Sequence, residues 1–320
     1  MSSYKPPYTI TSKIVNLISS ISQELTKIEY HQDTTITPKL RKINRIKTIS
    51  GTLEIEGNFL GKEKITAILD GKRVLGTYQE VLEAEGAIKA YKELENYRFD
   101  SLEDLLKAHK LLMSGILKNA GNFRSTNVGV GSEDGVSYIA PQPTFVPQLM
   151  SDLFDWLKYS DEHPLIKSCV FHYEFEFIHP FSDGNGRVGR LWQSVILYHY
   201  REVFNAIPTE SIVRENQAKY YEAIEQSTFL GESTPFIEFM LGVILKSIIS
   251  SVKSSVKSSV NTEDKILDYL NQNPKATIKE LANVLDLTTR AIEKQIANLK
   301  KANKLSRVGS ARKGYWQVLD

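Results

Sequence analysis

Apolar residues recur with helical spacing along most of the first 250 residues. Ile14, Ile18, Ile21, Leu25 and Ile28 are three or four positions apart, so they lie on one face of a helix. The same spacing predicts further helices at 38–57, 77–95, 101–118, 144–159, 164–178, 187–203, 212–228 and 235–250. The pattern therefore predicts a mainly α fold, built as a helical bundle.

Strand-like alternation of apolar and polar residues occurs at one place in these 250 residues. The segments 127–131 and 136–140 alternate and are separated by the turn-forming residues 132–135, which predicts a single β-hairpin. An isolated hairpin has an unpaired edge that can accept another extended chain. A hairpin that only closes a loop fits the same pattern.

The pattern changes after residue 250. Residues 250–260 repeat Ser-Ser-Val-Lys, which we interpret as a solvated connector, although valines four apart also suit a continued helix. Three helices (263–271, 277–284, 288–302) and two strands (304–309, 314–319) follow, in the order of a winged helix. We predict a helical region at 1–95, a core at 96–249, a connector at 250–261 and a winged helix-turn-helix domain, of α+β class, at 262–320.

Composition narrows the class of protein but names no partner. Hydrophobic residues make up 41% and charged residues 24% of 320, the profile of a soluble globular protein, and the net charge is only +2. Residues 261–320 are more basic, with eleven Lys and Arg against seven Asp and Glu. Seven of the basic residues lie along its third predicted helix and at the wing: Arg290, Lys294, Lys300, Lys301, Arg307, Arg312 and Lys313. They suit DNA binding, protein docking or a merely solvated face.

Three features bear on the compartment. The single cysteine, Cys169, excludes an intramolecular disulfide and fits a reducing compartment. The first residues contain no apolar core of signal-peptide type. The most apolar stretch, 236–249, is short and contains Glu238 and Lys246, which indicates a buried helix rather than a membrane span. We expect a cytoplasmic protein with no membrane partner.

The residues with candidate catalytic or ligand-binding groups cluster between His179 and Arg190, where a glycine-rich loop precedes the start of a helix. Backbone N–H groups near Gly184 to Arg187 would form an anion site at the helix N-terminus, and the two arginines add donors for phosphate oxygens. Asp183 supplies an oxygen ligand of the kind that Mg²⁺ takes beside phosphates. His179 can accept a proton near neutral pH. Together they predict chemistry on the phosphates of a nucleotide.

This segment resembles the signature of the Fic family, His-x-Phe-x-Asp/Glu-Gly-Asn-Gly-Arg-x-x-Arg, at all eight specified positions. The resemblance extends to Gly121–Arg124, Tyr138–Pro143, Tyr220-Tyr221 and Pro235–Ile237. It implies a Fic-type helical bundle whose catalytic core is 96–249 and whose hairpin is a flap. It also implies a protein adenylyltransferase, which carries out AMPylation: AMP passes from Mg-ATP to a Ser, Thr or Tyr hydroxyl of a target protein.

The resemblance also implies roles for individual residues. His179 deprotonates the target hydroxyl, and Asp183 holds Mg²⁺. The nucleotide is bound by Gly184, Asn185, Gly186, Arg187, Arg190, Tyr220 and Tyr221, of which Asn185 and the loop amides hold the α- and β-phosphates, Arg190 holds the γ-phosphate, and the tyrosines lie near the adenine. The flap, with Val128, Gly129, Val130 and Gly131, binds the target segment by strand addition.

A second signal lies at the end of the helix predicted from residue 38. Glu54 and Glu56 fall in its last turn, where acids oppose the helix dipole, so either solvent or a cation must compensate them. The string Thr52–Gly57 resembles the Fic inhibitory motif, Ser/Thr-x-x-x-Glu-Gly/Asn. The resemblance implies that Glu56 pairs with Arg190, denies that arginine to the γ-phosphate, and inhibits the protein in cis.

Two other functions remain as alternatives. One is the reverse hydrolysis, which removes AMP from a modified protein at the same site. The other is an ATP-sensing, DNA-binding regulator, which the intact His179 disfavours because binding alone needs no base. A kinase-like variant of the family carries Lys at the position of Gly186, so the glycine argues against that activity. By family habit we also expect a homodimer.

His172, His109 and Cys169 all lie on apolar helices without ligand spacing to other metal-binding residues. We interpret them as core packing.

Overall fold

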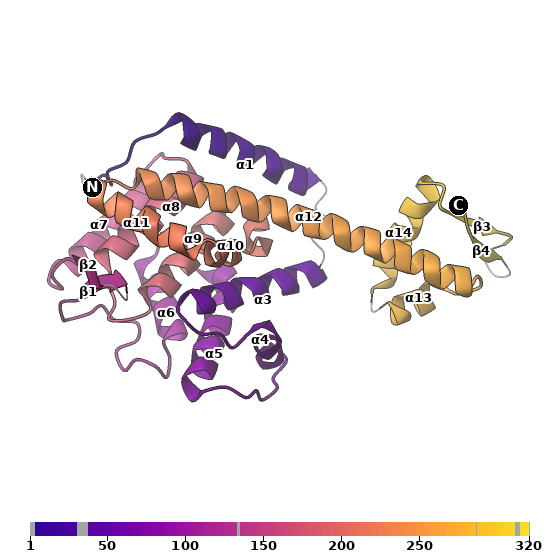
Figure 1. Cartoon of the computed structure of the whole chain (residues 1–320), viewed down its shortest axis with the longest axis horizontal. Coiled ribbons are helices and arrows are strands. Elements are labelled where there is room, and N and C mark those ends of the chain that lie inside the picture. Colours follow the sequence, from indigo (N-terminus) through magenta and orange to yellow (C-terminus); the bar gives the residue numbers. More distant parts are fainter. Residues whose placement is uncertain (1–3, 31–37, 133–134, 286, 311–313, 320) are drawn as a thin grey trace. The chain divides into compact units, whose positions relative to one another are not determined.

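The computed structural model describes residues 4–30, 38–132, 135–285, 287–310 and 314–319 (Figure 1). The chain divides into two compact units, Met1–Ser251 and Val252–Asp320. The first unit is helical apart from one hairpin, and the second combines helices with a two-stranded sheet. The predicted mainly α fold, with a single hairpin in the bundle and a small α+β unit after it, is confirmed.

Helices form the first unit, and they carry the labels of Figure 1. They are α1 (Ser12–Tyr30), α3 (Pro38–Ile55), α4 (Lys62–Leu69), α5 (Tyr78–Lys92), α6 (Leu102–Leu112), α7 (Val146–Tyr159), α8 (Pro164–Ile178), α9 (Asn185–Tyr200), α10 (Thr209–Glu215), α11 (Gln217–Leu230) and the first part of α12 (Thr234–Gln272), with the short 3-10 helices η1 (Leu94–Asn96) and η2 (Glu202–Ala206).

The centre of this unit is the pair α8 and α9, which pack along each other. Helix α8 is buried around most of its circumference, as expected of a helix that is apolar on all sides. Helix α9 adds the fully buried Trp192, whose Nε1 donates to the Phe99 carbonyl at 3.0 Å. The loop between the two helices is therefore held on a rigid core, and it carries the motif predicted to be chemical.

The hairpin consists of β1 (Gly129–Ser132) and β2 (Gly135–Ile139), which are antiparallel. Gly129 lies opposite Ile139, and the register shifts between Val130 and Gly131 as in a β-bulge. Among the described residues the two strands pair only with each other, so each keeps one open edge. The predicted hairpin is confirmed, and the tip of its turn, 133–134, lies outside the described residues.

The pattern missed one helix and placed the end of another too late. Helix α4 was not predicted, because it has eight residues, a single buried side chain at Ile65 and no side-chain cap at Gly61. The predicted helix at 101–118 ends at Leu112 because Gly115, with φ of 81°, takes a left-handed conformation soon after it.

The predicted helix at 212–228 is in fact two helices, α10 and α11. Asn216 separates them with φ of −123° and ψ of 32°, outside helical values. Its Nδ2 donates to the Ile212 carbonyl at 2.7 Å, so the side chain replaces a backbone donor at the end of α10.

The predicted connector at 250–261 has helical backbone, because α12 runs without a break from Thr234 to Gln272. This is the alternative that valines four residues apart left open. The boundary between the two units falls inside this helix, after Ser251.

Within the described residues, the window Thr234–Ser251 is the part of a helix long and apolar enough to cross a membrane by length and composition, with a mean hydropathy of 1.4. Its apolar side chains Phe236, Ile237, Leu241 and Ile244 are fully buried against the rest of the first unit. Burial in the protein core accounts for the apolar character of this window.

The second unit contains the end of α12, then α13 (Ile278–Val284), α14 (Thr289–Lys301), β3 (Leu305–Val308) and β4 (Tyr315–Val318). Thr277 and Glu280 form a capping box that stabilises the start of α13. The core is closed by Trp316, whose Nε1 donates to the Ala276 carbonyl at 3.0 Å. Helix, helix-turn-helix and β-hairpin follow in the predicted order.

Candidate active site

The motif loop is fixed at both ends by unusual backbone conformations. Helix α8 ends at His179, which is left-handed with φ of 49° and ψ of 60°, a conformation that costs a non-glycine residue about 1–2 kcal/mol. Helix α9 begins after Gly184, which has φ of 84°. A Cβ on Gly184 would stand 2.7 Å from the sulfur of the buried Met113, so only glycine fits there.

Two side chains hold the loop from inside. Asn185 Oδ1 accepts the Phe181 N–H at 2.9 Å, while its Nδ2 donates to the Phe181 carbonyl at 2.9 Å. His109 of α6 accepts the Gly121 N–H on Nδ1 at 2.8 Å, which leaves Nε2 to donate to the Asp183 carbonyl at 3.1 Å. Burial lowers the pKa of His109 to about 4, so the ring stays neutral.

His109 was interpreted from the sequence as core packing alone. It is buried, but it also stacks on Phe181 with ring centroids 3.6 Å apart and so supports the loop. The position of His109 in the helical pattern of the sequence does not indicate this contact. The side chain of Asn185 is likewise committed to the loop, which leaves its backbone N–H for a ligand.

Backbone donors gather at the start of α9. The first bond within the helix runs from the Val188 N–H to the Gly184 carbonyl at 3.0 Å, so the N–H groups of Asn185, Gly186 and Arg187 precede the helical ladder. These groups carry the positive end of the helix dipole. Backbone donors of the kind that bind anions therefore lie where the sequence predicted an anion site.

Arg187 lies beside these donors and is only 4% exposed. Its Nη2 contacts Asp183 Oδ1 at 3.2 Å, and its Nη1 lies 3.6 Å from Glu83 Oε1. The Nε and Nη1 atoms find no hydrogen-bond partner among the described residues. A buried guanidinium with spare donors suits a phosphate oxygen.

Asp183 is the candidate metal ligand, and its side chain is 52% exposed at the mouth of the loop. The described residues hold no group of three or more metal-binding side chains. Mg²⁺ beside a nucleotide takes one or two carboxylates and completes its shell with phosphate oxygens and water. A single half-exposed carboxylate next to a phosphate site fits that requirement.

Arg190 is occupied by the end of α3. Its Nη2 lies 2.5 Å from Glu56 Oε1, and its Nε donates to Thr52 Oγ1 at 3.1 Å. Burial acts to raise the pKa of Glu56, but the charge and hydrogen bond of Arg190 outweigh it and lower that pKa. Glu56 is therefore ionised at neutral pH. The structure brings together Glu56 and Arg190, the pair that the family resemblance implied, and adds Thr52 as a further contact of Arg190.

Glu56 also reaches the anion site itself. A Cβ on Gly186 would stand 2.6 Å from Glu56 Oε1. The carboxylate thus lies directly over the second residue of α9, and the glycine is what allows this approach.

His179 is partly buried, and its Nδ1 is buried without a hydrogen-bond partner among the described residues. Burial is the main cause that lowers the pKa of His179, and the charge of Arg124 lowers it further; the Glu176 backbone and the charges of Glu56 and Asp183 act to raise it, but less strongly. The imidazole is therefore neutral at pH 7 and able to accept a proton.

The two tyrosines predicted near the adenine differ in exposure. Tyr220 is 1% exposed, and its hydroxyl lies 3.0 Å from His172 Nε2, whose Nδ1 is 2.8 Å from Gln193 Oε1. Tyr221 is 44% exposed. Only Tyr221 of this pair presents a ring to solvent, whereas Tyr220 and His172 form a buried layer below it.

The flap residues Val128 to Gly131 lie in or just before β1. On the opposite strand, the Tyr138 hydroxyl donates to the Glu176 carbonyl at 2.7 Å and to the Phe177 carbonyl at 3.0 Å. The hairpin is thus attached to the end of α8, next to His179.

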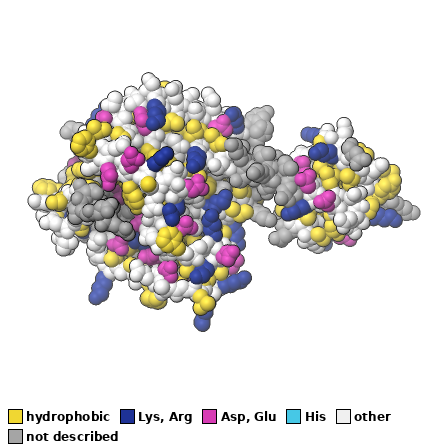
Figure 2. Space-filling model, viewed as in Figure 1, with side chains coloured by type: hydrophobic (Ala, Val, Ile, Leu, Met, Phe, Trp, Pro, Cys, Tyr) yellow, Lys and Arg dark blue, Asp and Glu magenta, His cyan; other side chains and the backbone are white. Residues whose placement is uncertain are grey.

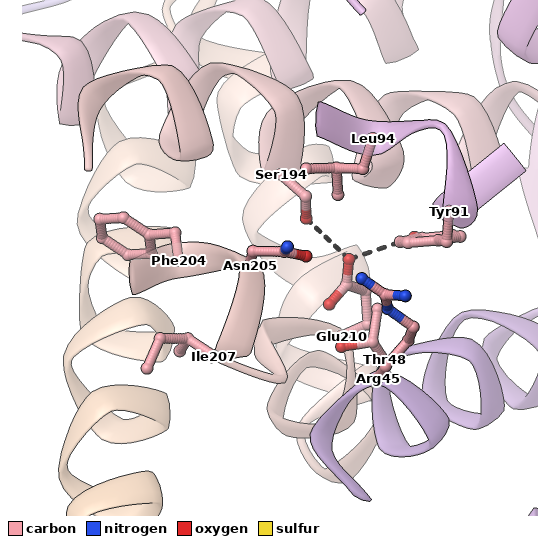
Figure 3. Close-up of a pocket in the computed structure, with 9 residues that line it drawn as sticks. All are labelled: Arg45, Thr48, Tyr91, Leu94, Ser194, Phe204, Asn205, Ile207 and Glu210. Carbon is pink, nitrogen blue, oxygen red and sulfur yellow. Dashed lines mark hydrogen bonds between the residues drawn. The ribbon is translucent and has the colours of Figure 1, made fainter. Parts of the chain in front are cut away.

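A small cavity lies elsewhere in the first unit, between α3, α5, η2 and α10 (Figure 3). It surrounds Glu210, whose carboxylate accepts from Ser194 at 2.8 Å and Tyr91 at 3.1 Å. Burial raises the pKa of Glu210. No residue of the motif lines this cavity, so we assign it no catalytic role.

Parts of the chain match known families. Residues 99–197 match the family model described as the Fic/DOC family, and residues 262–305 match the one described as winged helix-turn-helix DNA-binding. A Fic family protein from Desulfovibrio desulfuricans G20 has a similar solved structure, with 36% identity, a TM-score of 0.75 and coverage of 99% of this chain and 98% of its own. Fic-1 from C. elegans shares the fold at 22% identity, with a TM-score of 0.61 over 77% of this chain and 72% of its own.

Curated relatives show a similar likeness. Protein adenylyltransferase fic-1 of Caenorhabditis elegans is 26% identical over 238 residues, which is 70% of this chain and 44% of the relative. Protein adenylyltransferase Fic of Nematostella vectensis is 30% identical over 198 residues, 58% of this chain and 44% of its own. The chain spans less than half the length of these curated relatives.

Proposed function

The chain belongs to the Fic family, and from this premise we propose that it is a protein adenylyltransferase that transfers AMP from Mg-ATP to a Ser, Thr or Tyr hydroxyl of a target protein. One observation carries the proposal. An ordered anion site with spare buried donors at Arg187 stands beside a neutral imidazole, His179, that lies in the same loop. A protein that only binds a nucleotide would need the anion site but would not need a neutral imidazole beside it.

The proposed reaction uses the loop as follows. The N–H groups at the start of α9, with Arg187, bind the phosphates and orient the α-phosphorus. His179 accepts the proton of the target hydroxyl while its oxygen bonds to the α-phosphorus. The bond from the α-phosphorus to the oxygen bridging the β-phosphate breaks, and pyrophosphate leaves with both bonding electrons. Mg²⁺, when bound at Asp183, would offset the negative charge of the triphosphate.

The same proposal includes regulation of the site in cis. Arg190 is 3% exposed, and the contact with Glu56 takes up its Nη2 donor. A γ-phosphate and the Glu56 carboxylate are both anions that require this guanidinium, so they compete for it. We expect the inhibited protein to hold ATP poorly or in an unproductive position.

Separate labelling of ATP tests the proposal. The Glu56→Gly protein, incubated with cell extract and ATP labelled at the α- or the γ-phosphate, is expected to incorporate the α label into protein and not the γ label. The Asp183→Asn protein serves as the negative control. Incorporation of the γ label would replace the proposal with a kinase activity.

Absence of both labels from protein would favour one of two other functions. If the protein removes the α label from a previously modified target, the site is a de-AMPylating hydrolase. If it only binds ATP, it is a sensor. Both outcomes contradict the transferase proposal.

The second unit supports a further proposal, binding of duplex DNA, because residues 262–305 match a DNA-binding winged helix. Arg290 and Lys301 are exposed on α14, while Lys300 and Arg307 lie 5.1 Å and 4.6 Å from the Trp316 ring. Arg312 and Lys313 lie outside the described residues. On the face shown in Figure 2, basic and acidic side chains are mixed on both units. Only a few phosphate contacts are therefore expected.

Salt dependence is the expected signature of DNA binding. With about three phosphate contacts, the affinity should fall roughly 40-fold between 50 and 200 mM salt, as measured by fluorescence anisotropy of labelled duplex DNA. Arg290→Gln should reduce the slope of log affinity against log salt by about one, while Lys62→Gln in the first unit should not change it. Binding that is absent at 50 mM salt, or unaffected by salt, would leave protein docking as the role of this unit.

A further inference from the structure

The last turn of α8 ends in four carbonyl groups without helical donors. The final bond within the helix runs from the His179 N–H to the Phe175 carbonyl at 3.0 Å. The carbonyls of the next four residues, Glu176 to His179, therefore need donors from elsewhere, because a helix leaves its last four carbonyls unpaired.

The hairpin and the segment before it supply these donors. Tyr138 of β2 donates to the Glu176 and Phe177 carbonyls. Arg124 donates through Nε to the His179 carbonyl at 2.7 Å and through Nη2 to the Ile178 carbonyl at 3.4 Å. Two side chains thus donate to all four of these carbonyls.

Arg124 is also bonded to both ends of the hairpin. Its Nη1 donates to the Thr126 carbonyl at 2.9 Å, before β1, and its Nη2 donates to the Pro141 carbonyl, after β2. Its backbone N–H donates to the Pro180 carbonyl at 2.9 Å. One guanidinium therefore joins both bases of the hairpin to the residue that carries the imidazole.

The environment of Arg124 is unusual for a buried cation. The side chain is 3% exposed, and its hydrogen bonds to the described residues go to carbonyl groups rather than to carboxylates. A cation at the negative end of a helix dipole is stabilised there. Arg124 Nε donates to the carbonyl of His179, whose left-handed backbone costs free energy. Such a conformation persists only when the surrounding residues hold it.

We propose that Arg124 and Tyr138 form a clamp that positions His179 and couples it to the target-binding flap, so that the flap and the imidazole move as one body. The two are positioning residues, since neither touches the reacting atoms. The inference rests on the proposed transferase function only for its kinetic consequences. The coupling itself is a property of the free protein.

The kinetic test uses the Glu56→Gly protein as background, so that transfer is measurable. Arg124→Gln removes the cation and most of the donors, and a misplacement of His179 by about 1 Å is expected to lower kcat for transfer about 100-fold. The affinity for Mg-ATP, measured by calorimetry, should change less than about twofold, because the phosphate site lies on α9. An equal loss of kcat and ATP affinity would indicate general damage and would contradict the clamp.

Spectroscopic tests on the ATP-free protein do not depend on transferase activity. The charge of Arg124 lowers the pKa of His179. An NMR titration of the His179 ring should show a higher pKa in Arg124→Gln and a nearly unchanged one in Arg124→Lys, which keeps the charge. In Arg124→Gln, the amides of β1 and the His179 amide should exchange with solvent faster together. The exposed control Arg201→Gln should change neither measurement.

The outcomes separate the two proposals. If the Glu56→Gly protein transfers no AMP, the proposed function fails while titration and exchange still test the clamp. Independent exchange of β1 and His179, with an unchanged His179 pKa in Arg124→Gln, overturns the clamp. If Arg124→Gln does not fold, Arg124→Lys and Tyr138→Phe carry the test: each should raise exchange at both places, and their effects should not be additive when combined.

Discussion

The His179→Ala protein is expected to bind Mg-ATP almost as well as the wild type and to transfer no measurable AMP. A positioned general base contributes about 10²–10⁴ in rate, or roughly 3–5 kcal/mol of transition-state free energy. The proposed phosphate-binding N–H groups lie at the start of α9, after Gly184, and do not belong to the His179 side chain that the substitution removes. The measurement pairs α-label transfer with ATP affinity from calorimetry, both in the Glu56→Gly background.

A matched variant controls for the loss of a histidine ring. His199 lies on α9 with its Nδ1 3.0 Å from the Val195 carbonyl and is exposed. His199→Gln should retain full transfer activity. Transfer by His179→Ala within about tenfold of the parent would remove the imidazole from the mechanism, whatever its effect on ATP binding.

The pH profile gives a second check on the same residue. His179 acts as a base only when neutral, and burial lowers its pKa below 6.5. The value of kcat/KM should therefore be constant from neutral pH down past 6.5 and fall only as the pH drops through the lowered pKa. A fall that begins above 6.5 would show that the acid limb belongs to another group.

The sequence predicted the elements that depend on local periodicity. Helices α1, α8 and α9 repeat apolar residues over several turns, and the motif between α8 and α9 lies within twelve consecutive residues, so its spacing fixes the loop. The meeting of Glu56 and Arg190 was predicted only through the family resemblance. Nothing in the local pattern relates two residues 134 positions apart.

The features that the sequence did not predict depend on contacts that produce no recognisable pattern of residues along the chain. Arg124 binds backbone carbonyls, which every residue carries, so its sequence neighbours do not identify its partners. His109 supports the loop through a single hydrogen bond and a stacked ring, and a buried core histidine on an apolar helix has the same spacing. Asn216 ends a helix that periodicity alone continues, because its side chain competes with the backbone for hydrogen bonds.

Glu56→Gly is expected to raise AMP transfer by about ten- to a hundredfold. A hydrogen bond to a charged group is worth about 1.5–3 kcal/mol, and every 1.4 kcal/mol corresponds to a factor of ten in an equilibrium. Removal of the carboxylate frees Arg190 Nη2 and clears the space above Gly186. The measurement is the rate of α-label transfer to the same target, together with ATP affinity.

Glu56→Gln and Glu54→Gln form a matched pair that separates charge from helix stability. Glu54 lies in the same turn but contacts Ser50 and Arg214 rather than Arg190. Only Glu56→Gln should activate, because it alone removes the charge at Arg190. Equal activation by both would mean that loosening α3, rather than the Glu56–Arg190 pair, controls the site.

The ionisation of Glu56 limits the conditions under which its ion pair with Arg190 can break. The pKa of Glu56 is lowered, so the pairing is complete above the ordinary carboxyl pKa and is lost only as the pH falls through the lowered value. Acidification from pH 8 to pH 6.5, which stays above the ordinary carboxyl pKa, therefore cannot free Arg190. The ratio of Glu56→Gly activity to wild-type activity should stay constant from pH 6.5 to 8. It should also be independent of protein concentration, because Glu56 and Arg190 belong to one chain, and a ratio that falls on dilution would place the inhibition between chains.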